Sequence, residues 1–266
     1  MPDPLVSIVL PTYNGARYLP EAIRTCLDQT YRNIELVVVD DASTDGTPEV
    51  LASVGDPRLR VIRHEANRKL PGALNTGFAA ARGDYLTWTS DDNRYMPVAV
   101  ERMLTYLQAR PDTAFVCAGY VFINPDGSRA DRPPRAPGPI WLLPVRNVIG
   151  ACFLYRREVA EKIGPYNESC FLAEDYEYWL RVQRRFRIGV IPEPLYEYRQ
   201  HETSLSSTYE HGRIVDAAER AKLAAWAKEP WPVRRWLMAQ AKPVLGYLVC
   251  QWVNEPLITA RKAMGA

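Results

Sequence analysis

The sequence predicts an α/β protein with a mostly parallel central sheet and helices on both of its faces. Short apolar runs alternate with helical segments through the first half of the chain, a pattern typical of parallel sheets that are covered on both sides. Polar clusters directly follow three of the predicted strands. The length of 266 residues suits one large domain with a C-terminal helical extension, since single cores grow to about 250 residues.

The first half of the chain contains the most regular elements. Apolar, β-branched runs predict strands at residues 6–11, 34–39, 59–63 and 85–89. Between them, apolar side chains recur at helical spacing, and Pro48 suits the first turn of a short helix. The predicted helices span residues 16–29, 48–53, 72–82 and 97–109.

The second half is less regular. Residues 124–138 are rich in proline, arginine, aspartate and glycine, which predicts a loop that would close over a site as a lid. The shorter predicted elements are an apolar segment at residues 151–155, helices at 159–163 and 174–184, and strands at 188–191 and 195–198. From about residue 209 the pattern is mostly helical, so we divide the chain into residues 1–205 and an extension of residues 206–266.

Composition narrows the class of protein. Hydrophobic residues make up 47% and charged residues 24% of the chain, as in globular proteins, and the net charge of +2 excludes a generally basic nucleic-acid binder. The five cysteines lack metal-ligand spacing and predict buried thiols in a reducing compartment. We see no secretory signal and no apolar run of about 20 residues, so the expected location is the cytoplasm.

The extension interleaves tryptophans with basic residues. They are Trp226, Trp231, Trp236 and Trp252 with Lys228, Arg234, Arg235 and Lys242. We expect this segment to pack on the rest of the chain or on a second subunit in a homodimer. The alternative is peripheral contact with the inner face of the membrane, because tryptophan and basic residues favour the interface between lipid and water.

Three polar clusters follow predicted strands, namely residues 12–14, 40–41 and 90–93. Ligands in open α/β sheets bind at the carboxyl ends of the strands, so the clusters are expected to converge on one crevice. Adjacent carboxylates such as Asp91 and Asp92 repel each other unless a divalent cation that also binds phosphate compensates them. Taken alone, however, this pair is more typical of a solvated turn before a helix.

Three other polar positions are ambiguous when each is taken alone. Asp40 and Asp41 suit either a polar turn or a carboxylate that contacts a base or ribose. Glu174 and Asp175 suit either favourable charges at a helix N-terminus or a general base beside an acceptor hydroxyl. A lone histidine in a polar loop, such as His201, is usually exposed, but its imidazole suits a metal held by Asp91.

Taken together, five motifs resemble the inverting glycosyltransferase family 2, whose members have the Rossmann-like GT-A type of fold. The motifs are residues 6–14 (VSIVLPTYN), 37–47 (VVVDDASTDGT), 72–77 (GALNTG), 90–92 (SDD) and 174–181 (EDYEYWLR). The resemblance therefore implies transfer of a sugar from a nucleotide-diphosphate donor to an acceptor hydroxyl. UDP is the expected nucleotide because it is common in the family, and the acceptor would be a saccharide, a lipid-linked compound or another hydroxyl compound.

The resemblance also assigns roles to particular positions. The implied donor-binding residues are Pro11, Thr12, Tyr13, Asp41, Lys69, Asn75, Asp91 and Asp92. Asp91 would ligate a Mn²⁺ or Mg²⁺ ion that bridges the two phosphates, and His201 falls where some relatives place another metal or diphosphate contact. Asp175 would be the catalytic base, and Glu174 would orient the acceptor or the sugar.

The chain departs from the family pattern at three positions. Thr89 stands where many members carry the first Asp of an Asp-x-Asp motif, so metal binding would depend more on Asp91. Leu74 stands where an arginine is frequent, and Lys69 where a glycine is frequent. The basic contact to the donor would then come from Arg68 or Lys69, or be absent.

Other classes of function are less compatible with the sequence. No dinucleotide-binding Gly-x-Gly-x-x-Gly, Walker loop or Gly-x-Ser-x-Gly elbow is present, which disfavours dehydrogenases, ATPases and serine hydrolases. Two rivals stay open, a non-catalytic nucleotide-binding protein on the same fold and a nucleotidyltransferase. The latter would normally need a glycine-rich loop near the N-terminus, which residues 11–15 do not supply.

Overall fold

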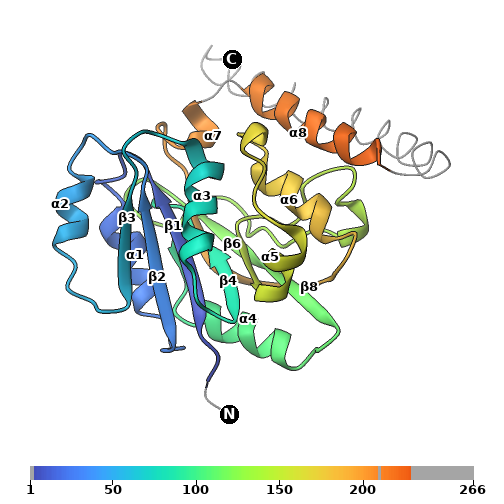
Figure 1. Cartoon of the computed structure of the whole chain (residues 1–266), viewed down its shortest axis with the longest axis horizontal. Coiled ribbons are helices and arrows are strands. Elements are labelled where there is room, and N and C mark those ends of the chain that lie inside the picture. Colours follow the sequence, from blue (N-terminus) through green and yellow to red (C-terminus); the bar gives the residue numbers. More distant parts are fainter. Residues whose placement is uncertain (1–2, 209–210, 229–266) are drawn as a thin grey trace.

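The computed structural model describes residues 3–208 and 211–228, which fold around an eight-stranded sheet (Figure 1). The strands are β1 (Val6–Thr12), β2 (Ile34–Asp40), β3 (Leu59–Arg63), β4 (Tyr85–Trp88), β5 (Arg94–Tyr95), β6 (Thr113–Ile123), β7 (Cys152–Arg156) and β8 (Arg187–Arg199). Their order across the sheet is β3-β2-β1-β4-β7-β6-β8-β5.

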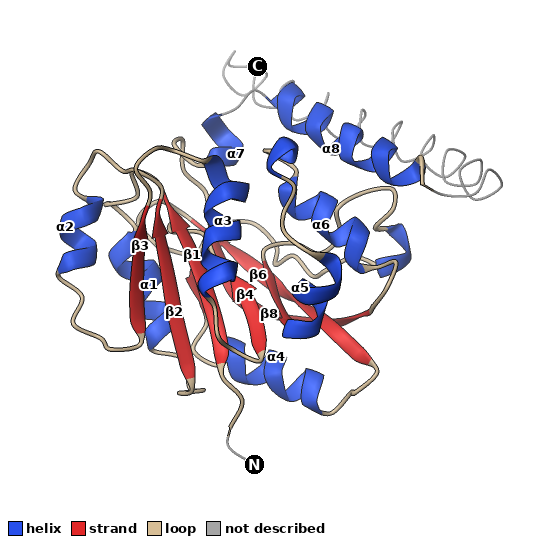
Figure 2. Ribbon diagram, viewed as in Figure 1, coloured by secondary structure: helices blue, strands red, loops and turns tan. Residues whose placement is uncertain are grey.

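Helices cover both faces of this sheet (Figure 2). They are α1 (Leu19–Leu27), α2 (Thr47–Ala52), α3 (Lys69–Ala80), α4 (Ala99–Gln108), α5 (Arg157–Ile163), α6 (Glu174–Val182), α7 (Leu205–Thr208) and α8 (His211–Trp226), with short 3₁₀ helices η1 (Ile140–Leu142) and η2 (Glu168–Cys170). The predicted layers are thus confirmed, although most predicted helix ends differ by a few residues from those in the structure.

The side chains of β1 show how the two faces are built. Ile8 and Leu10 are buried in a core with α1 and α4, whereas Val9 is buried in a second core with Leu74 of α3 and Trp179 of α6. Successive strand residues point to opposite faces, so a strand covered on both sides is apolar along most of its length. This is why the run in β1 lacks the polar alternation of a strand with one wet face.

The N-terminal half of the sheet is parallel, as predicted. β1 pairs with β2 and β4, and β2 pairs with β3, all in parallel register. The carboxyl ends of these strands therefore meet at one edge, which is where the polar clusters lie. β7 then runs antiparallel to both β4 and β6, and β5 runs antiparallel to β8, so the other half of the sheet is mixed.

Two strands of this mixed half differ from the sequence-based expectation. β6 is an eleven-residue strand that was not predicted, and β8 is continuous where two short strands were expected. β8 passes Pro192 and Pro194 because its pairing with β6 shifts register beside Gly119. A Cβ at Gly119 would lie 2.7 Å from the carbonyl oxygen of Pro192, so only glycine lets the strands approach here.

Part of the C-terminal extension packs on the main domain. α8 lies against α6, and the indole nitrogen of Trp226 donates a hydrogen bond to the Pro144 carbonyl oxygen at 2.8 Å. The other extension tryptophans, Trp231, Trp236 and Trp252, lie outside the described residues. Every helix within residues 3–208 and 211–228 is too short or too polar to cross a bilayer.

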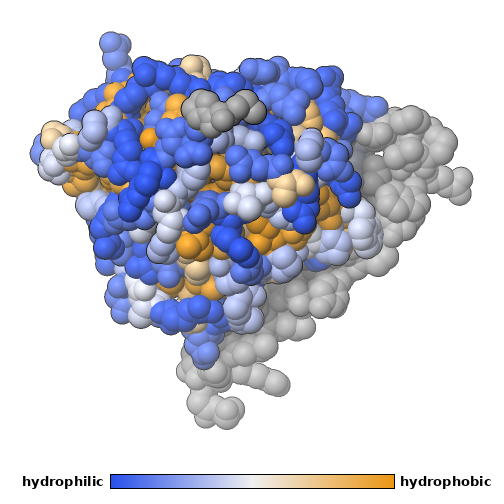
Figure 3. Space-filling view, turned by 90° about the horizontal axis from the view of Figure 1, so that it is seen from below, coloured by the Kyte–Doolittle hydropathy of each residue, from blue (hydrophilic) through white to orange (hydrophobic). Residues whose placement is uncertain are grey.

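The molecular face in Figure 3 is largely hydrophilic, with hydrophobic residues exposed in smaller areas between the polar ones.

The predicted loop at residues 124–138 begins with a tight turn and then returns along β6, because Ile123 bridges to Arg129 and Tyr120 bridges to Arg135. Closure of this loop over a site stays a prediction.

Candidate functional site

A cavity of about 590 Å³ opens at the carboxyl ends of β1, β2 and β4. All three predicted polar clusters contribute to its wall, together with the start of α3 and residues 201–208. Its lining includes Pro11, Thr12, Tyr13, Asp41, Lys69, Asp91, Asp92 and His201. The structure thus brings together eight of the predicted site residues, as the rule of converging strand ends implied.

Asp91 is held tightly on one side of this cavity. The hydroxyl of Thr12 donates a hydrogen bond to Asp91 Oδ2 at 2.5 Å. A Cβ at Gly15 would come within 2.1 Å of the same oxygen, so glycine is required beside the carboxylate. Burial and the charge of Asp92 raise the pKa of Asp91 to about 7. A cation bound at this position would relieve both effects.

Asp92 has one oxygen engaged and one free of protein partners. His201 Nε2 lies 2.9 Å from Asp92 Oδ2, while Asp92 Oδ1 is buried without a hydrogen-bond partner. Within the described part of the chain, no three His, Cys, Asp or Glu side chains form a ready-made metal cage. The two carboxylates nevertheless fit a divalent ion that takes its remaining ligands from a diphosphate and water, as Mg²⁺ commonly does.

His201 is oriented by hydrogen bonds at both ring nitrogens. Its Nδ1 lies 2.9 Å from the Thr203 hydroxyl, and its Nε2 lies 2.9 Å from Asp92 Oδ2. In this arrangement the imidazole holds a carboxylate of the candidate metal site. Direct ligation of the ion by His201 stays a prediction.

Asp41 is fixed by a histidine that sequence analysis missed. His64 Nδ1 lies 2.7 Å from Asp41 Oδ1, and His64 Nε2 lies 2.9 Å from the Thr76 hydroxyl. The backbone amide of Arg68 donates to the same Asp41 oxygen at 2.8 Å. His64 directly follows β3, which is a fourth strand that ends at this edge. Its position after a predicted strand was the signal in the sequence that could have identified it as a site residue. The Asp41 carboxylate therefore has one defined orientation.

The backbone around the cavity is strained. Among the described residues, the non-glycine positions with positive φ are Asn14 (55°), Ala42 (64°), Lys69 (66°) and Leu172 (76°). Asn14 and Lys69 line the cavity, Ala42 follows Asp41, and Leu172 follows the cavity residue Phe171. Left-handed backbone costs an L-residue about 1–2 kcal/mol and is concentrated at functional sites. The positive φ at Lys69 would suit the glycine that the family resemblance implies at this position.

The structure separates the two candidates for a basic donor contact. Lys69 lines the cavity, whereas the Arg68 guanidinium contacts Glu168 at 3.2 Å and the Thr76 hydroxyl at 3.3 Å. Leu74, at the position where an arginine is frequent, is fully buried in the core. Lys69 is thus the better placed of the two.

Asn75 lies away from the cavity lining. Its amide nitrogen donates to the Tyr166 carbonyl oxygen at 3.0 Å, and its amide oxygen accepts from the Tyr166 backbone nitrogen at 2.8 Å. These bonds fasten the segment before α6 to α3. The expected donor contact of Asn75 stays a prediction.

Glu174 and Asp175 begin α6 and lie outside the cavity lining, although Phe171 from the preceding turn lines it. Asp175 accepts hydrogen bonds from the Asn147 amide at 3.0 Å and from the Tyr176 backbone nitrogen at 2.6 Å. Glu174 is 5% exposed, and its Oε2 has no partner.

Burial governs the protonation of the Glu174 and Asp175 carboxyl groups. Burial and the charge of Asp175 raise the pKa of Glu174 to about 8, and burial raises the pKa of Asp175 as well. Near neutral pH Glu174 is therefore expected to be protonated. Two carboxyl groups in unequal environments are the usual arrangement for separate acid and base roles.

Comparison with known proteins supports the fold and the family. Residues 7–164 match the family model described as glycosyl transferase family 2. An uncharacterized glycosyltransferase of Rickettsia felis is 38% identical over 193 residues, which cover 68% of this chain and 32% of the relative. The chain therefore spans about a third of the length of that relative.

Two solved structures share the architecture at low sequence identity. TarS of S. aureus in complex with UDP-GlcNAc has a TM-score of 0.71 and 16% identity, covering 89% of this chain and 71% of the other. The mannosyltransferase PcManGT of Pyrobaculum calidifontis, in complex with GDP-Man and Mn²⁺, has a TM-score of 0.58 and 20% identity, covering 94% and 83%. These likenesses confirm the expected GT-A type of fold. Because the family model matches more than half of the sequence, the chain belongs to glycosyltransferase family 2.

Proposed function

We propose that this protein transfers a sugar from a UDP-sugar to an acceptor hydroxyl, with inversion at the anomeric carbon and assistance from a divalent metal ion. One observation carries the proposal: Thr12, Asp41 and the Asp91–Asp92 pair reach one cavity from three neighbouring strand ends. TarS, a structural neighbour of the same fold, binds UDP-GlcNAc. That similarity supports UDP as the nucleotide to test first.

The donor half of the proposal follows from the chemistry of the cavity wall. Asp41, oriented by His64, would accept hydrogen bonds from the uracil or the ribose. Tyr13 is 51% exposed at the cavity, which leaves its ring accessible for contact with the base. Lys69 would provide positive charge for the diphosphate.

Asp91 and Asp92 would hold Mn²⁺ or Mg²⁺. When bound, the ion would stabilise the negative charge that develops on the leaving diphosphate. The protein's own contribution is to bring two carboxylates together before the ligand arrives. Thr12 fixes one of them and His201 the other.

The acceptor half of the proposal rests on the pair of carboxyl groups at the start of α6, Glu174 and Asp175. The acceptor oxygen forms a bond to the anomeric carbon from the face opposite the diphosphate, and the bond from that carbon to the diphosphate oxygen breaks. The acceptor proton passes to Asp175, and UDP leaves with the bonding electron pair. Protonated Glu174 would donate a hydrogen bond that orients the acceptor or the sugar.

Calorimetric titration with UDP, dTDP, GDP and CMP, with and without Mn²⁺, tests the donor half. We expect UDP to bind most tightly, and its affinity to depend on both Mn²⁺ and Asp91. In Asp91→Ala the enhancement by Mn²⁺ should disappear while the metal-free affinity for UDP persists. Wild-type protein that binds none of the four nucleotides would refute the proposal, and pyrophosphate release from a nucleoside triphosphate would favour a nucleotidyltransferase.

A further inference from the structure

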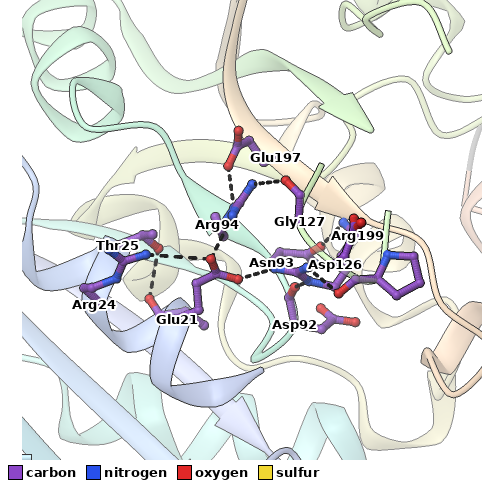
Figure 4. Close-up of polar contacts among 12 residues, drawn as sticks. Glu21, Arg24, Thr25, Asp92, Asn93, Arg94, Asp126, Gly127, Glu197 and Arg199 are labelled. Carbon is purple, nitrogen blue, oxygen red and sulfur yellow. Dashed lines mark hydrogen bonds and ion pairs between the residues drawn. The ribbon is translucent and has the colours of Figure 1, made fainter. Parts of the chain in front are cut away.

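Arg199, the last residue of β8, lies within a group of polar contacts (Figure 4). It is 2% exposed, and arginine is rarely buried to this degree unless it is paired. Its Nε donates to the carbonyl oxygen of Asp92 at 2.8 Å, and its Nη1 donates to the carbonyl oxygen of Pro125 at 3.0 Å. Its Nη2 forms an ion pair with Glu21 of α1.

The charges around Arg199 are balanced by a chain of ion pairs. Glu21 also binds Arg94 Nη1 at 2.8 Å, and Arg94 Nε binds Glu197 at 2.5 Å. Burial raises the pKa of Glu21, but the hydrogen bonds and charges of Arg94 and Arg199 outweigh burial and leave this pKa lowered. Glu21 is therefore ionised at neutral pH, and Glu21 and Glu197 are the carboxylates that pair with Arg94 and Arg199.

Residues at and just after the end of β8 form hydrogen bonds with the turn that carries the two candidate metal-binding carboxylates, Asp91 and Asp92. Besides its side-chain bond to the Asp92 carbonyl, Arg199 donates its backbone nitrogen to Asn93 Oδ1 at 2.7 Å. Two residues later, His201 binds the Asp92 carboxylate. The backbone and the side chain of Asp92 are thus held from one direction, while Thr12 holds Asp91 from β1.

Tyr18 connects Arg199 and His201 to the wall of the donor cavity. Its ring lies 4.6 Å from the Arg199 guanidinium carbon and 4.8 Å from the ring centroid of His201. Tyr18 itself lines the cavity. Arg199 therefore supports the donor site without lining it.

We propose that Arg199 is a positioning residue of the metal site, which locks the turn at residues 91–93 so that Asp91 and Asp92 present their carboxylates to one divalent ion. The inference rests on the function proposed above. Adjacent carboxylates repel each other, so a turn without this support would relax and separate them. Groups that orient metal ligands without touching the metal commonly change its affinity by about 10–100-fold.

Arg94 provides a matched control because it belongs to the same network. It shares Glu21 with Arg199, and it donates to the Gly127 carbonyl oxygen at 3.0 Å in the turn that follows β6. Its side-chain partners are Glu21, Glu197 and Gly127, none of which belongs to the turn at residues 91–93. Loss of general stability in the network should thus affect both variants, whereas loss of turn geometry should affect Arg199 alone.

The test compares Arg199→Lys and Arg94→Lys with the wild type. Free Mn²⁺ is titrated by electron paramagnetic resonance in the presence of saturating UDP, UDP affinity is measured without metal, and folding is monitored by circular dichroism. We expect Arg199→Lys to weaken Mn²⁺ binding by about tenfold or more with UDP affinity within about twofold of the wild type. Arg94→Lys should bind Mn²⁺ as the wild type does.

Equal Mn²⁺ affinity in Arg199→Lys and the wild type, or an equal loss in both variants, would overturn the proposal for Arg199 and leave the proposed function intact. Wild-type protein that binds neither Mn²⁺ nor UDP would overturn both. If Arg199→Lys does not fold, Asn93→Ala removes the hydrogen bond from the Arg199 backbone nitrogen, and the same metal-specific loss is expected. A folded Asn93→Ala protein with unchanged Mn²⁺ affinity would contradict the positioning role.

Discussion

The two carboxylate pairs of this protein, Asp91–Asp92 and Glu174–Asp175, are both adjacent in sequence and both have a member whose pKa is raised by burial. Their supports differ. Asp91 and Asp92 are bound by side chains from β1 and from the segment after β8. At the start of α6, Asp175 has an amide and a backbone nitrogen as donors, and Glu174 Oε2 has no partner.

This contrast supports the different roles proposed above for two chemically similar pairs. A turn whose two carboxylates are both held by side chains suits a cation, which satisfies both charges at once. At the start of α6, the unsupported carboxyl group of Glu174 suits a proton instead, since burial raises its pKa to about 8. Both pairs consist of carboxyl groups, and the different roles that we propose for them follow from their environments.

The largest expected effect comes from removing the carboxyl group of Asp175 from the Glu174–Asp175 pair. In Asp175→Asn, kcat should fall by about 10³-fold, because general base catalysis typically contributes 10²–10⁴-fold. Binding of Mn²⁺ and UDP should be unchanged, which is the reverse of the pattern expected for Asp91→Ala. The measurement is UDP release from the UDP-sugar in the presence of acceptor, with calorimetry for binding.

Glu177→Gln on the same helix is the control for Asp175→Asn, since Glu177 is already paired with Arg181 at 2.9 Å. It should retain most of the activity. Equal losses of kcat in the two variants would indicate that α6 is simply sensitive to substitution.

A smaller effect is expected from Glu174→Gln, and it depends on pH. The pKa of Glu174 is near 8 in the folded protein and near 4.5 when unperturbed. The folded state therefore binds more protons than the unfolded state between these values, so stability falls as pH rises from about 5 to 8. Glutamine cannot ionise, and the Tm of Glu174→Gln relative to the wild type should increase over this range.

Thermal melts at pH 5 and pH 8 measure this difference in Tm. The same variant should lose the decline in kcat that we expect for the wild type above about pH 8, where Glu174 loses its proton. A Tm difference that does not change with pH would contradict protonation of Glu174 in the folded protein at neutral pH.

The smallest effect concerns the donor side and the backbone strain at Lys69. Replacing Lys69 with glycine relieves a left-handed L-residue, so the free energy of unfolding should rise by about 1 kcal/mol. UDP affinity should fall at the same time, because the cavity loses a cation. Denaturant melts and calorimetry measure the two changes.

Arg68→Gly is the comparison for Lys69→Gly, since Arg68 is a neighbouring cation outside the cavity lining. It should lower stability and leave UDP affinity nearly unchanged. If both substitutions weaken UDP binding equally, the effect reflects overall charge and not the position of Lys69.

Sequence patterns predicted the parallel half of the sheet well because local signals suffice there. The strands around β1 are short apolar runs separated by amphipathic helices, and strand ends in such sheets share one edge. That rule is enough to predict that Thr12, Asp41 and Asp91 lie at one site. In the mixed half, β6 was missed although its apolar run is of the same kind as those of β1 and β2, and the prolines of β8 imitate a break in the strand.

By itself, the sequence determined which residue types stand at the strand ends and at the start of α6, because periodicity and motif order are local properties. Only the tertiary structure decided which of these groups touch one another. His64 on Asp41, Arg199 on the Asp92 carbonyl, and Asn75 on Tyr166 join residues 23 to 107 positions apart. Such contacts depend on how the helices and strands pack, and no local pattern in the chain specifies that packing.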